Sequence, residues 1–279
     1  MPTLTHANGQ TTYYEDDNYT DPWKPHETIL IQHGYGRHSA FWYHWIPALA
    51  RHYRVIRRDA RGHGKSSAPD KASGYDYSVD TILGEIVNTL DQLGISKVHW
   101  LGESTGGIWG EAMAVHHPER LLSLTVCSSP MYLPPAALKS LSFGYDSWAE
   151  SLRKLGSRGW AVEAAKLLKT DQVHDQMYTK WWVDQVAVPS GDALADHAEL
   201  LEKIDAREFV DQIKVPMLIL APRNSTLATL DGDDNQHDLN RRVKGSQMIV
   251  IDGKGHEIYI DEPEACQKAF LSFLSELKK

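Results

Sequence analysis

Ser104 lies at the centre of a G-x-S-x-G pattern that spans residues 102–106. The residues before it, 97–101, predict a strand, and residues 108–117 predict a helix that Pro118 ends. A strand that turns directly into a helix holds the turning residue in a strained conformation with its side chain projecting outward, so the flanking residues must be small. Ser104 is therefore a candidate nucleophile for attack on a carbonyl carbon.

His256 is the candidate for the base that such a nucleophile requires. A serine hydroxyl is a poor nucleophile at neutral pH unless an adjacent group removes its proton. His256 follows Gly255 in a loop directly after an expected strand at residues 246–252. The carboxyl ends of parallel strands meet at one edge of a sheet, so we expect His256 to lie beside Ser104.

Tyr35 and Thr105 are the candidates for the oxyanion hole. The negative oxygen that forms on attack is stabilised by backbone N–H groups, one from the residue after the nucleophile and one from a loop after an earlier strand. Thr105 follows Ser104, and Tyr35 lies in the loop His33-Gly34-Tyr35-Gly36 after an expected strand at residues 27–32. The alternative interpretation of this loop is a plain glycine turn.

The elements that must position these residues alternate along the chain. Apolar runs predict further strands at 53–59, 121–127 and 215–220, and helical spacing predicts helices at 40–51, 79–93 and 263–277. Strands separated by helices of this length indicate parallel βαβ units, so we expect an α/β fold with a mostly parallel central sheet flanked by helices.

The alternation stops between residues 131 and 205, where the sequence is helix-like and aromatic. We expect an inserted helical cap over residues 131–205, above a core made of residues 1–130 and 206–279, because open α/β folds bind ligands at the carboxyl edge of the sheet. The expected substrate pocket is built by Gly34, Trp42, Tyr132, Trp148 and Trp182. For each aromatic residue alone, packing of the cap against the core is the alternative.

Four motifs together resemble the α/β-hydrolase fold family: His33 to Gly36, Asp59 to Ser66, Gly102 to Gly107, and Gly255-His256. The resemblance spans residues 28–273 and includes the cap. It implies a serine hydrolase related to esterases, lactonases, carbon–carbon bond hydrolases and non-haem haloperoxidases. Epoxide hydrolases and haloalkane dehalogenases of this family carry Asp at the elbow tip, so Ser104 argues against both.

The acid of the expected triad is missing. In the family it lies nine residues after the Pro that begins a late strand, which is Ser225 here, and the alternative family position falls on Ser128 or Ser129. Three substitutes are open: Glu103 as the acid, Asn224 or Ser225 as a neutral partner that orients His256, or a displaced carboxylate such as Asp231. The acidic cluster of Asp231, Asp233 and Asp234 is alternatively interpreted as the start of a helix.

Composition excludes several classes of function. The net charge of -8 and the absence of a basic run argue against nucleic acid or a membrane surface as partner. No apolar stretch approaches the roughly 20 residues that span a bilayer, and residues 1–6 lack a signal region, which predicts a cytoplasmic protein. The sequence contains no pattern for a metal, nucleotide or other cofactor. A monomer or homodimer is expected.

The function expected from the sequence is cofactor-free hydrolysis of a carboxylic ester or lactone of a small, apolar or ring-containing molecule, through an acyl-serine intermediate. Two alternatives stay open. The missing acid fits a ligand-binding, receptor-like or weakly active relative of these hydrolases. The same residues also fit a perhydrolase or haloperoxidase, since they do not distinguish water from peroxide as the acceptor.

Overall fold

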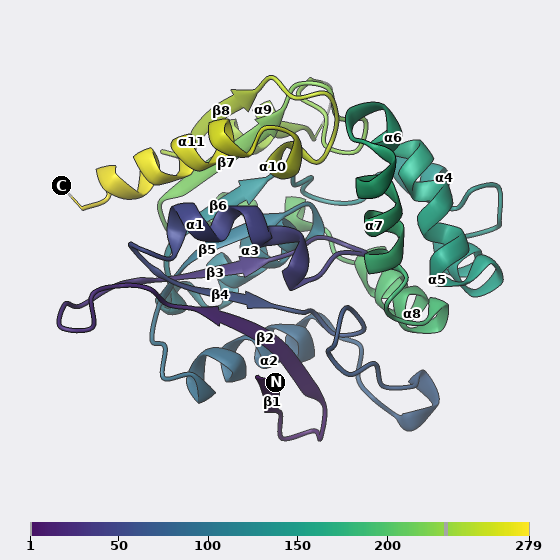
Figure 1. Cartoon of the computed structure of the whole chain (residues 1–279), viewed down its shortest axis with the longest axis horizontal. Coiled ribbons are helices and arrows are strands. Elements are labelled where there is room, and N and C mark those ends of the chain that lie inside the picture. Colours follow the sequence, from purple (N-terminus) through teal and green to yellow (C-terminus); the bar gives the residue numbers. More distant parts are fainter. Residues whose placement is uncertain (1, 232–233, 279) are drawn as a thin grey trace.

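The central sheet is mostly parallel and runs through the middle of the molecule (Figure 1). The computed structural model describes residues 2–231 and 234–278. Across the sheet the strand order is β1-β2-β4-β3-β5-β6-β7-β8. From β4 to β8 every neighbouring pair is parallel, whereas β1 and β2 join the edge in antiparallel fashion. The strands are β1 Thr3–Thr5, β2 Thr11–Asp17, β3 Thr28–Gln32, β4 Arg54–Arg58, β5 Val98–Glu103, β6 Leu121–Cys127, β7 Met217–Pro222 and β8 Gln247–Ile251.

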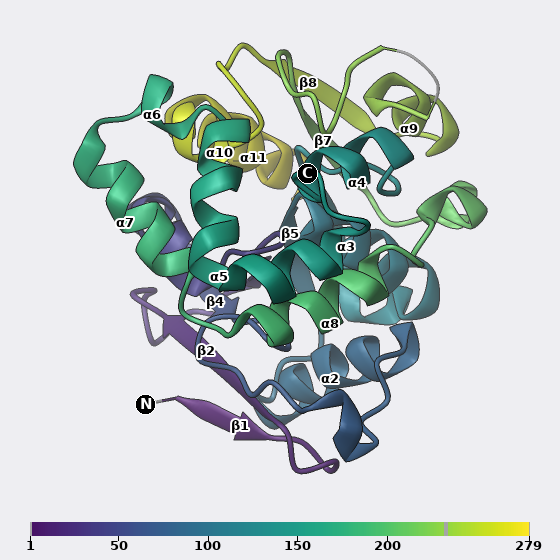
Figure 2. The ribbon, with the colours of Figure 1, turned by 90° about the vertical axis from the view of Figure 1, so that its right-hand side faces the viewer.

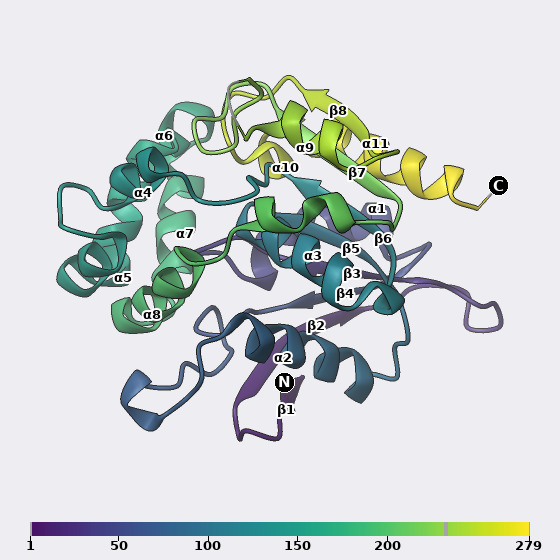
Figure 3. The same ribbon diagram turned by 180° about the vertical axis from the view of Figure 1, so that it is seen from behind.

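Helices cover both faces of this sheet, which explains why the inner strands β3, β5 and β7 are buried along their whole length. In Figure 1, α1 and α11 lie on the near face, and Figure 3 shows α2, α3 and α9 on the other face. The helices of the core are α1 Ile46–Leu49, α2 Val79–Gln92, α3 Thr105–His116, α9 Gln236–Arg242, α10 Ile258–Asp261 and α11 Pro263–Glu276. Short 3-10 turns are η1 Ser39–Trp45, η2 Lys71–Ser73, η3 Pro118–Arg120, η4 Ala206–Glu208 and η5 Val210–Gln212.

A group of helices between β6 and β7 gathers at one side of the sheet, on the right in Figure 1 and facing the viewer in Figure 2. They are α4 Pro135–Leu141, α5 Trp148–Leu167, α6 Thr170–Val173, α7 Gln176–Val186 and α8 Gly191–Leu201. Helix α5 is kinked at Gly156, whose φ of 68° and ψ of 167° interrupt the helical backbone. We refer to residues 131–205 as the cap, and the division into cap and core remains our proposal. Among the residues described here, no helix has the length and apolar character needed to cross a membrane.

Two parts of the fold differ from the sequence-based expectation. Residues expected as one helix over 40–51 form the 3-10 turn η1 followed by the short helix α1, with Pro47 at the start of α1. The antiparallel strands β1 and β2 were not expected, because residues 11–17 are polar and five of these seven residues are only partly buried or exposed. β2 pairs with β4 at the edge of the sheet, and β1 pairs with β2, without a local apolar pattern that would have predicted either strand.

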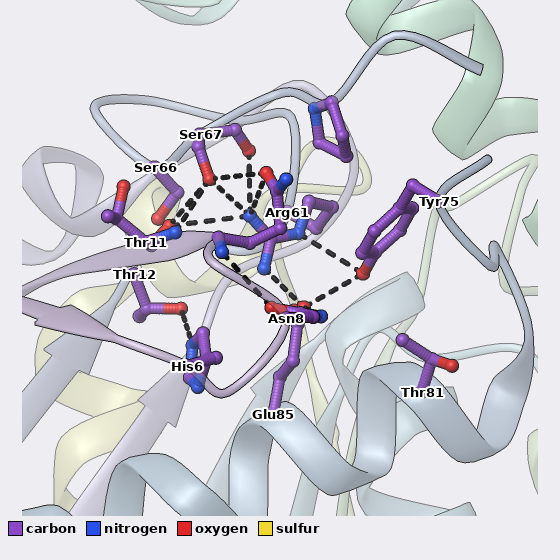
Figure 4. Close-up of polar contacts among 12 residues, drawn as sticks. His6, Asn8, Thr11, Thr12, Arg61, Ser66, Ser67, Tyr75, Thr81 and Glu85 are labelled. Carbon is purple, nitrogen blue, oxygen red and sulfur yellow. Dashed lines mark hydrogen bonds and ion pairs between the residues drawn. The ribbon is translucent and has the colours of Figure 1, made fainter. Parts of the chain in front are cut away.

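A buried polar network fixes β2 to the core (Figure 4). Arg61 and Glu85 form an ion pair whose side chains are almost completely buried. Arg61 also donates to the carbonyl oxygen of Ser67 at 3.1 Å, and Oε1 of Glu85 accepts from Tyr75 at 2.8 Å and from Asn8 at 3.2 Å. The network therefore joins the β1–β2 hairpin, the loop after β4 and helix α2.

Candidate active site

Ser104 sits at the sharp turn between β5 and α3, with φ of 50° and ψ of -124°. Such a backbone conformation is costly for a residue other than glycine and is found at functional sites. The turn closes tightly because Gly102 and Gly106 approach neighbouring backbone: a side chain on Gly106 would overlap the carbonyl oxygens of Gln32 and His33. The structure thus has the strand–turn–helix geometry that the sequence predicts around Ser104.

His256 lies in the loop between β8 and α10, with its Nε2 atom 3.1 Å from Oγ of Ser104. The imidazole is buried, and this burial lowers the pKa of His256 to about 4. The ring is therefore neutral around pH 7, which is the state that a base requires. Parallel strands β5 and β8 bring these two residues together from 152 positions apart.

Ser225 is the residue that contacts the other nitrogen of His256. Its Oγ lies 2.9 Å from Nδ1 of His256, in the loop after β7. The same oxygen accepts hydrogen bonds from the backbone N–H groups of Leu227, at 3.1 Å, and Ala228, at 3.0 Å. A hydroxyl oxygen has two lone pairs, so these two bonds leave its own proton to point at Nδ1. Of the two neutral partners considered for His256, Ser225 is the one whose side chain contacts Nδ1.

Glu103 is buried on the opposite side of the imidazole. Its Oε1 lies 3.8 Å from Nε2 of His256, and its Oε2 accepts from the backbone N–H of Gly34 at 2.9 Å. Burial raises the pKa of Glu103 to about 7, although the nearby Arg37 guanidinium opposes this shift. Glu103 therefore faces the nitrogen that also faces Ser104, and does not contact Nδ1.

The other residues considered as partners of His256 lie elsewhere. Asn224 donates to the carbonyl oxygen of Gly253 at 2.7 Å and so fixes the loop that carries His256. Asp231 is exposed, and its nearest ionic partner is His237 at 3.8 Å. Asp234 pairs with Arg207 at 2.7 Å, and Asp233 lies outside the described residues. This cluster precedes α9, in agreement with its interpretation as the start of a helix.

Tyr35 and Thr105 both line the cavity at Ser104. Thr105 is the first residue of α3, where the backbone N–H has no acceptor within the helix and where the helix dipole favours negative charge. The Tyr35 side chain reaches the cap: its hydroxyl donates to the carbonyl oxygen of Leu194 at 2.7 Å, and its ring packs on Trp148 at 4.2 Å. The cap thus contacts the loop expected to form half of the oxyanion hole.

The cavity is mainly apolar and lies between cap and core. Its volume is about 50 Å³, so in this structure it accommodates a small group. Besides the polar residues Tyr35, Arg37, Glu103, Ser104, Thr105 and His256, its walls are Pro130, Leu133, Leu141, Trp148, Trp160, Ala164, Leu167, Leu168 and Leu227.

Of the expected pocket residues, Trp148 is in this wall, and the other four lie behind or away from it. Gly34 presents its backbone to Glu103. Trp42 is fully buried and stacks on Tyr259 at 4.5 Å, so it is part of the core. Tyr132 lies under the guanidinium of Arg207 at 3.5 Å. Trp182 packs behind Arg37 at 4.3 Å.

Arg37 and Glu257 are site residues that the sequence analysis missed. Arg37 lines the cavity, and its Nε donates to Glu257 at 2.9 Å. The only local signal was their position beside Tyr35 and His256, since the pair is 220 residues apart in the chain. Within residues 2–231 and 234–278, no cluster of three or more His, Cys, Asp or Glu side chains is suited to hold a metal ion.

Comparison with known proteins identifies the family. Residues 27–263 match the model of the alpha/beta hydrolase fold family, so the chain belongs to that family. Membership supports a hydrolase, and the observed sheet and helices have the corresponding fold.

Proteins similar to this chain include an esterase, a lactonase and an enol-lactonase of known structure. The chain is 28% identical over 243 residues to the pimeloyl-(acyl-carrier protein) methyl ester esterase of Aeromonas hydrophila, covering 85% of this chain and 91% of that protein. It is 26% identical over 254 residues to 3-oxoadipate enol-lactonase 1 of Acinetobacter baylyi, covering 90% and 89%. The crystal structure of the enol-lactonase from Burkholderia xenovorans LB400 superposes with a TM-score of 0.81 at 23% identity, covering 98% of this chain and all of that one.

Proposed function

We propose that this chain hydrolyses a carboxylic ester or lactone of a small apolar molecule through an acyl intermediate on Ser104. The observation that carries the proposal is the contact of 3.1 Å between Oγ of Ser104, held in its strained turn, and Nε2 of the neutral His256. The names of the esterase and lactonase relatives support the same class of substrate.

The reaction proceeds in two halves. Nε2 of His256 takes the proton of Ser104 as Oγ bonds to the carbonyl carbon, and the carbonyl oxygen becomes negative, facing the N–H groups of Tyr35 and Thr105. The carbon–oxygen bond to the leaving alcohol then breaks, and the alcohol takes the proton from Nε2. Water attacks the acyl group, gives its proton to Nε2, and the bond to Oγ breaks with return of that proton to Ser104.

The tasks of a triad acid are divided between two residues in this proposal. Ser225 orients the ring through Nδ1. Glu103, when ionised, lies close enough to Nε2 to favour the imidazolium that forms during both halves. Because Oγ of Ser225 accepts two N–H groups, its own proton faces Nδ1 in the resting state, and the ring proton is on Nε2. Base catalysis uses the other tautomer, with the ring proton on Nδ1. In that tautomer the Ser225 O–H turns away, and its oxygen accepts from Nδ1 in place of one of the two backbone N–H groups. We therefore expect slower hydrolysis than with a carboxylate at position 225.

The cavity narrows the substrate class. Apolar cap and core side chains surround Ser104, and the Arg37 charge beside them is paired with Glu257. These features favour an uncharged substrate with a short acyl or alcohol part over one with a free carboxylate.

A fluorophosphonate probe tests the nucleophile directly. We expect labelling of the folded wild type at Ser104, identified by peptide mass spectrometry, and no labelling of Ser104→Ala. A panel of uncharged esters and lactones of graded size then measures hydrolysis, with the smallest members fastest. Absence of labelling at Ser104 in folded protein contradicts the proposal.

The second candidate function is ligand binding without turnover, and the replacement of the triad acid by Ser225 is the observation that favours it. A protein that binds members of the panel, measured by calorimetry, yet neither hydrolyses them nor reacts with the probe supports this candidate over the hydrolase.

A further inference from the structure

A buried ion pair beside the active site is completed by a residue of the cap. Nε and Nη2 of Arg37 lie 2.9 Å and 2.8 Å from Oε1 of Glu257. Nε1 of Trp182, in cap helix α7, lies 3.2 Å from both carboxylate oxygens of Glu257. The face of Trp182 also packs on the Arg37 guanidinium, 4.3 Å from its ring centre. All three residues are buried.

Each member of the ion pair is adjacent to one part of the catalytic machinery. Glu257 directly follows His256 in the chain. Arg37 lies two residues after Tyr35, and its Nη1 donates to the carbonyl oxygen of Tyr35 at 3.3 Å. The ion pair therefore connects the loop of the base with the loop expected to form half of the oxyanion hole.

The geometry of the pair depends on α7. A buried ion pair is favourable only when its hydrogen bonds are complete, because both charges have lost their water. Trp182 supplies a donor to both oxygens of Glu257 and an aromatic face to Arg37, which replace part of that hydration. A second contact between the cap and this region joins Nε2 of His174, in the turn just before α7, to Asp261 in α10 at 2.9 Å.

We propose that Arg37, Glu257 and Trp182 form a positioning unit, through which the seating of cap helix α7 aligns the oxyanion loop and His256 together. None of the three touches the reacting atoms in this role; they act through Tyr35 and His256. The inference rests on the proposed hydrolase function. It assigns the cap a part in the rate of the chemical step, in addition to its contribution to the cavity wall.

The test compares two neighbouring tryptophans of α7. Trp182→Phe keeps an aromatic ring over Arg37 but removes the N–H that Glu257 accepts. The matched control is Trp181→Phe, which removes the same kind of N–H from the neighbouring residue. The Trp181 ring packs on Phe41 at 5.0 Å and reaches the unit only through Phe41, whose ring centre is 5.5 Å from the Arg37 guanidinium. We expect Trp182→Phe to lower kcat about tenfold with KM changed less than twofold, since the loss is in alignment rather than in binding. Trp181→Phe should stay within twofold of the wild type in both.

A conservative replacement separates positioning from folding. Glu257→Gln retains an oxygen that accepts from Arg37 and Trp182 but removes the counter-charge of Arg37, whereas Glu257→Ala removes both the oxygen and the charge. We expect Glu257→Gln to have at least ten times the kcat of Glu257→Ala, with thermal unfolding used to show that both variants are folded at the assay temperature. Equal kcat for the two Glu257 variants, or equal effects of the two tryptophan changes, overturns the proposal.

A measurement without turnover distinguishes this proposal from the hydrolase proposal. The imidazole NMR signals of His256, assigned by comparison with His256→Gln, should shift in Trp182→Phe and stay in place in Trp181→Phe. If wild-type Ser104 fails to react with the fluorophosphonate, the proposed function fails, while these signals still decide the positioning unit. Unchanged His256 signals in Trp182→Phe count against the unit even in an active enzyme.

Discussion

Two buried polar networks in this chain are built in opposite ways. Around Arg61, a full ion pair with Glu85 is surrounded by further hydrogen bonds that join three segments of the core (Figure 4). Around His256, the ring contacts two serine hydroxyls, and the nearest carboxylate atom lies 3.8 Å away, beyond hydrogen-bond distance. In the first network the central Arg61 forms an ion pair. In the second, the central His256 is hydrogen-bonded to uncharged side chains.

The difference separates stability from reactivity. An ion pair bonded on several sides holds its partners in one protonation state and one position. A base must exchange protons, and burial keeps His256 neutral because it disfavours the charged imidazolium. Removal of a residue from the first network should therefore affect unfolding, whereas removal from the second should affect the rate.

The largest effect is expected from His256→Ala. Without the base, Ser104 keeps its proton, and the hydrolysis rate should fall about 10³-fold. The unfolding midpoint should fall less than on loss of the Arg61–Glu85 pair, since the ring is uncharged and, within the described residues, makes two side-chain hydrogen bonds. Comparison of kcat and denaturant midpoints with the wild type checks this, and a large loss of stability would erase the contrast between the networks.

The opposite pattern is expected for Glu85→Gln, which leaves Arg61 buried without its counter-charge. Loss of one partner of a buried pair costs about 3 to 4 kcal/mol of unfolding free energy. The kcat of the molecules that remain folded should not change. Asp211→Asn, in an exposed pair with Arg242, is the control and should leave the denaturant midpoint in place.

Another buried carboxyl, Glu111 in α3, sharpens the comparison. Neither of its oxygens has a hydrogen-bond partner in the described part of the protein. Burial raises the pKa of Glu111 well above its usual value, so it folds in the neutral form. In the unfolded chain the Glu111 carboxyl ionises above about pH 4.5. Stability is therefore lost as the pH rises above this value, by about 1.4 kcal/mol per pH unit, until the carboxyl of the folded protein ionises as well.

Glu111→Leu should remove this loss and raise the unfolding free energy at pH 7. The gain should be smaller at pH 4, where the unfolded carboxyl is also protonated and the variant only removes a buried neutral polar group. Denaturant titrations of wild type and variant at both pH values measure the difference. A variant that is less stable at pH 7 would show that Glu111 has a bonding partner of its own.

Ser225→Asp tests whether the absence of a carboxylate beside Nδ1 of His256 limits the rate of hydrolysis. A carboxylate can accept from Leu227, Ala228 and Nδ1 of His256 at the same time, and so favours the tautomer in which Nε2 is free. We expect kcat/KM to rise at least about tenfold, and Ser225→Ala to lower it. A lower rate for the aspartate variant would mean that the hydroxyl is the better partner in this site.

The smallest effect is expected from Glu103→Gln and depends on pH. With a pKa of about 7, the Glu103 carboxyl is neutral at pH 6 and ionised at pH 8, where its charge favours the His256 imidazolium. The variant should therefore lose about threefold in kcat at pH 8 and almost nothing at pH 6. A rate–pH profile measures both, and equal losses at the two values would point to altered packing.

The parts of the site that follow from local sequence could be predicted. Glycines around Ser104 define a turn within five residues, and the position of His256 after the last apolar strand is sufficient to place it at the same sheet edge. These inferences depend on short segments and on the parallel alternation of strands and helices. The α/β hydrolase fold was predictable for the same reason.

The partner of Nδ1 and the charged neighbours could not be fixed in this way. The sequence left open whether an acid, Glu103 or Asp231, or a neutral residue, Asn224 or Ser225, contacts His256. A distance between loops is set by the packing of β5, β7 and β8 and has no local signal. The Arg37–Glu257 pair depends on an approach across 220 residues. Expected pocket aromatics such as Trp42 turned inward, since burial of a large ring in the core is as favourable as a place in a cavity wall.

The kink in α5 has a consequence for the shape of the cavity above Ser104. Residues from both sides of the bend, Trp148 before it and Trp160, Ala164 and Leu167 after it, form much of the ceiling over Ser104. The backbone conformation of Gly156 is one that other residues rarely adopt. The backbone conformation of this one residue therefore sets how the two halves of α5 meet above Ser104. The contact between Ser104 and His256 depends on other elements. We expect substitution of Gly156 to change which groups fit above Ser104, while the contact between Ser104 and His256 is kept.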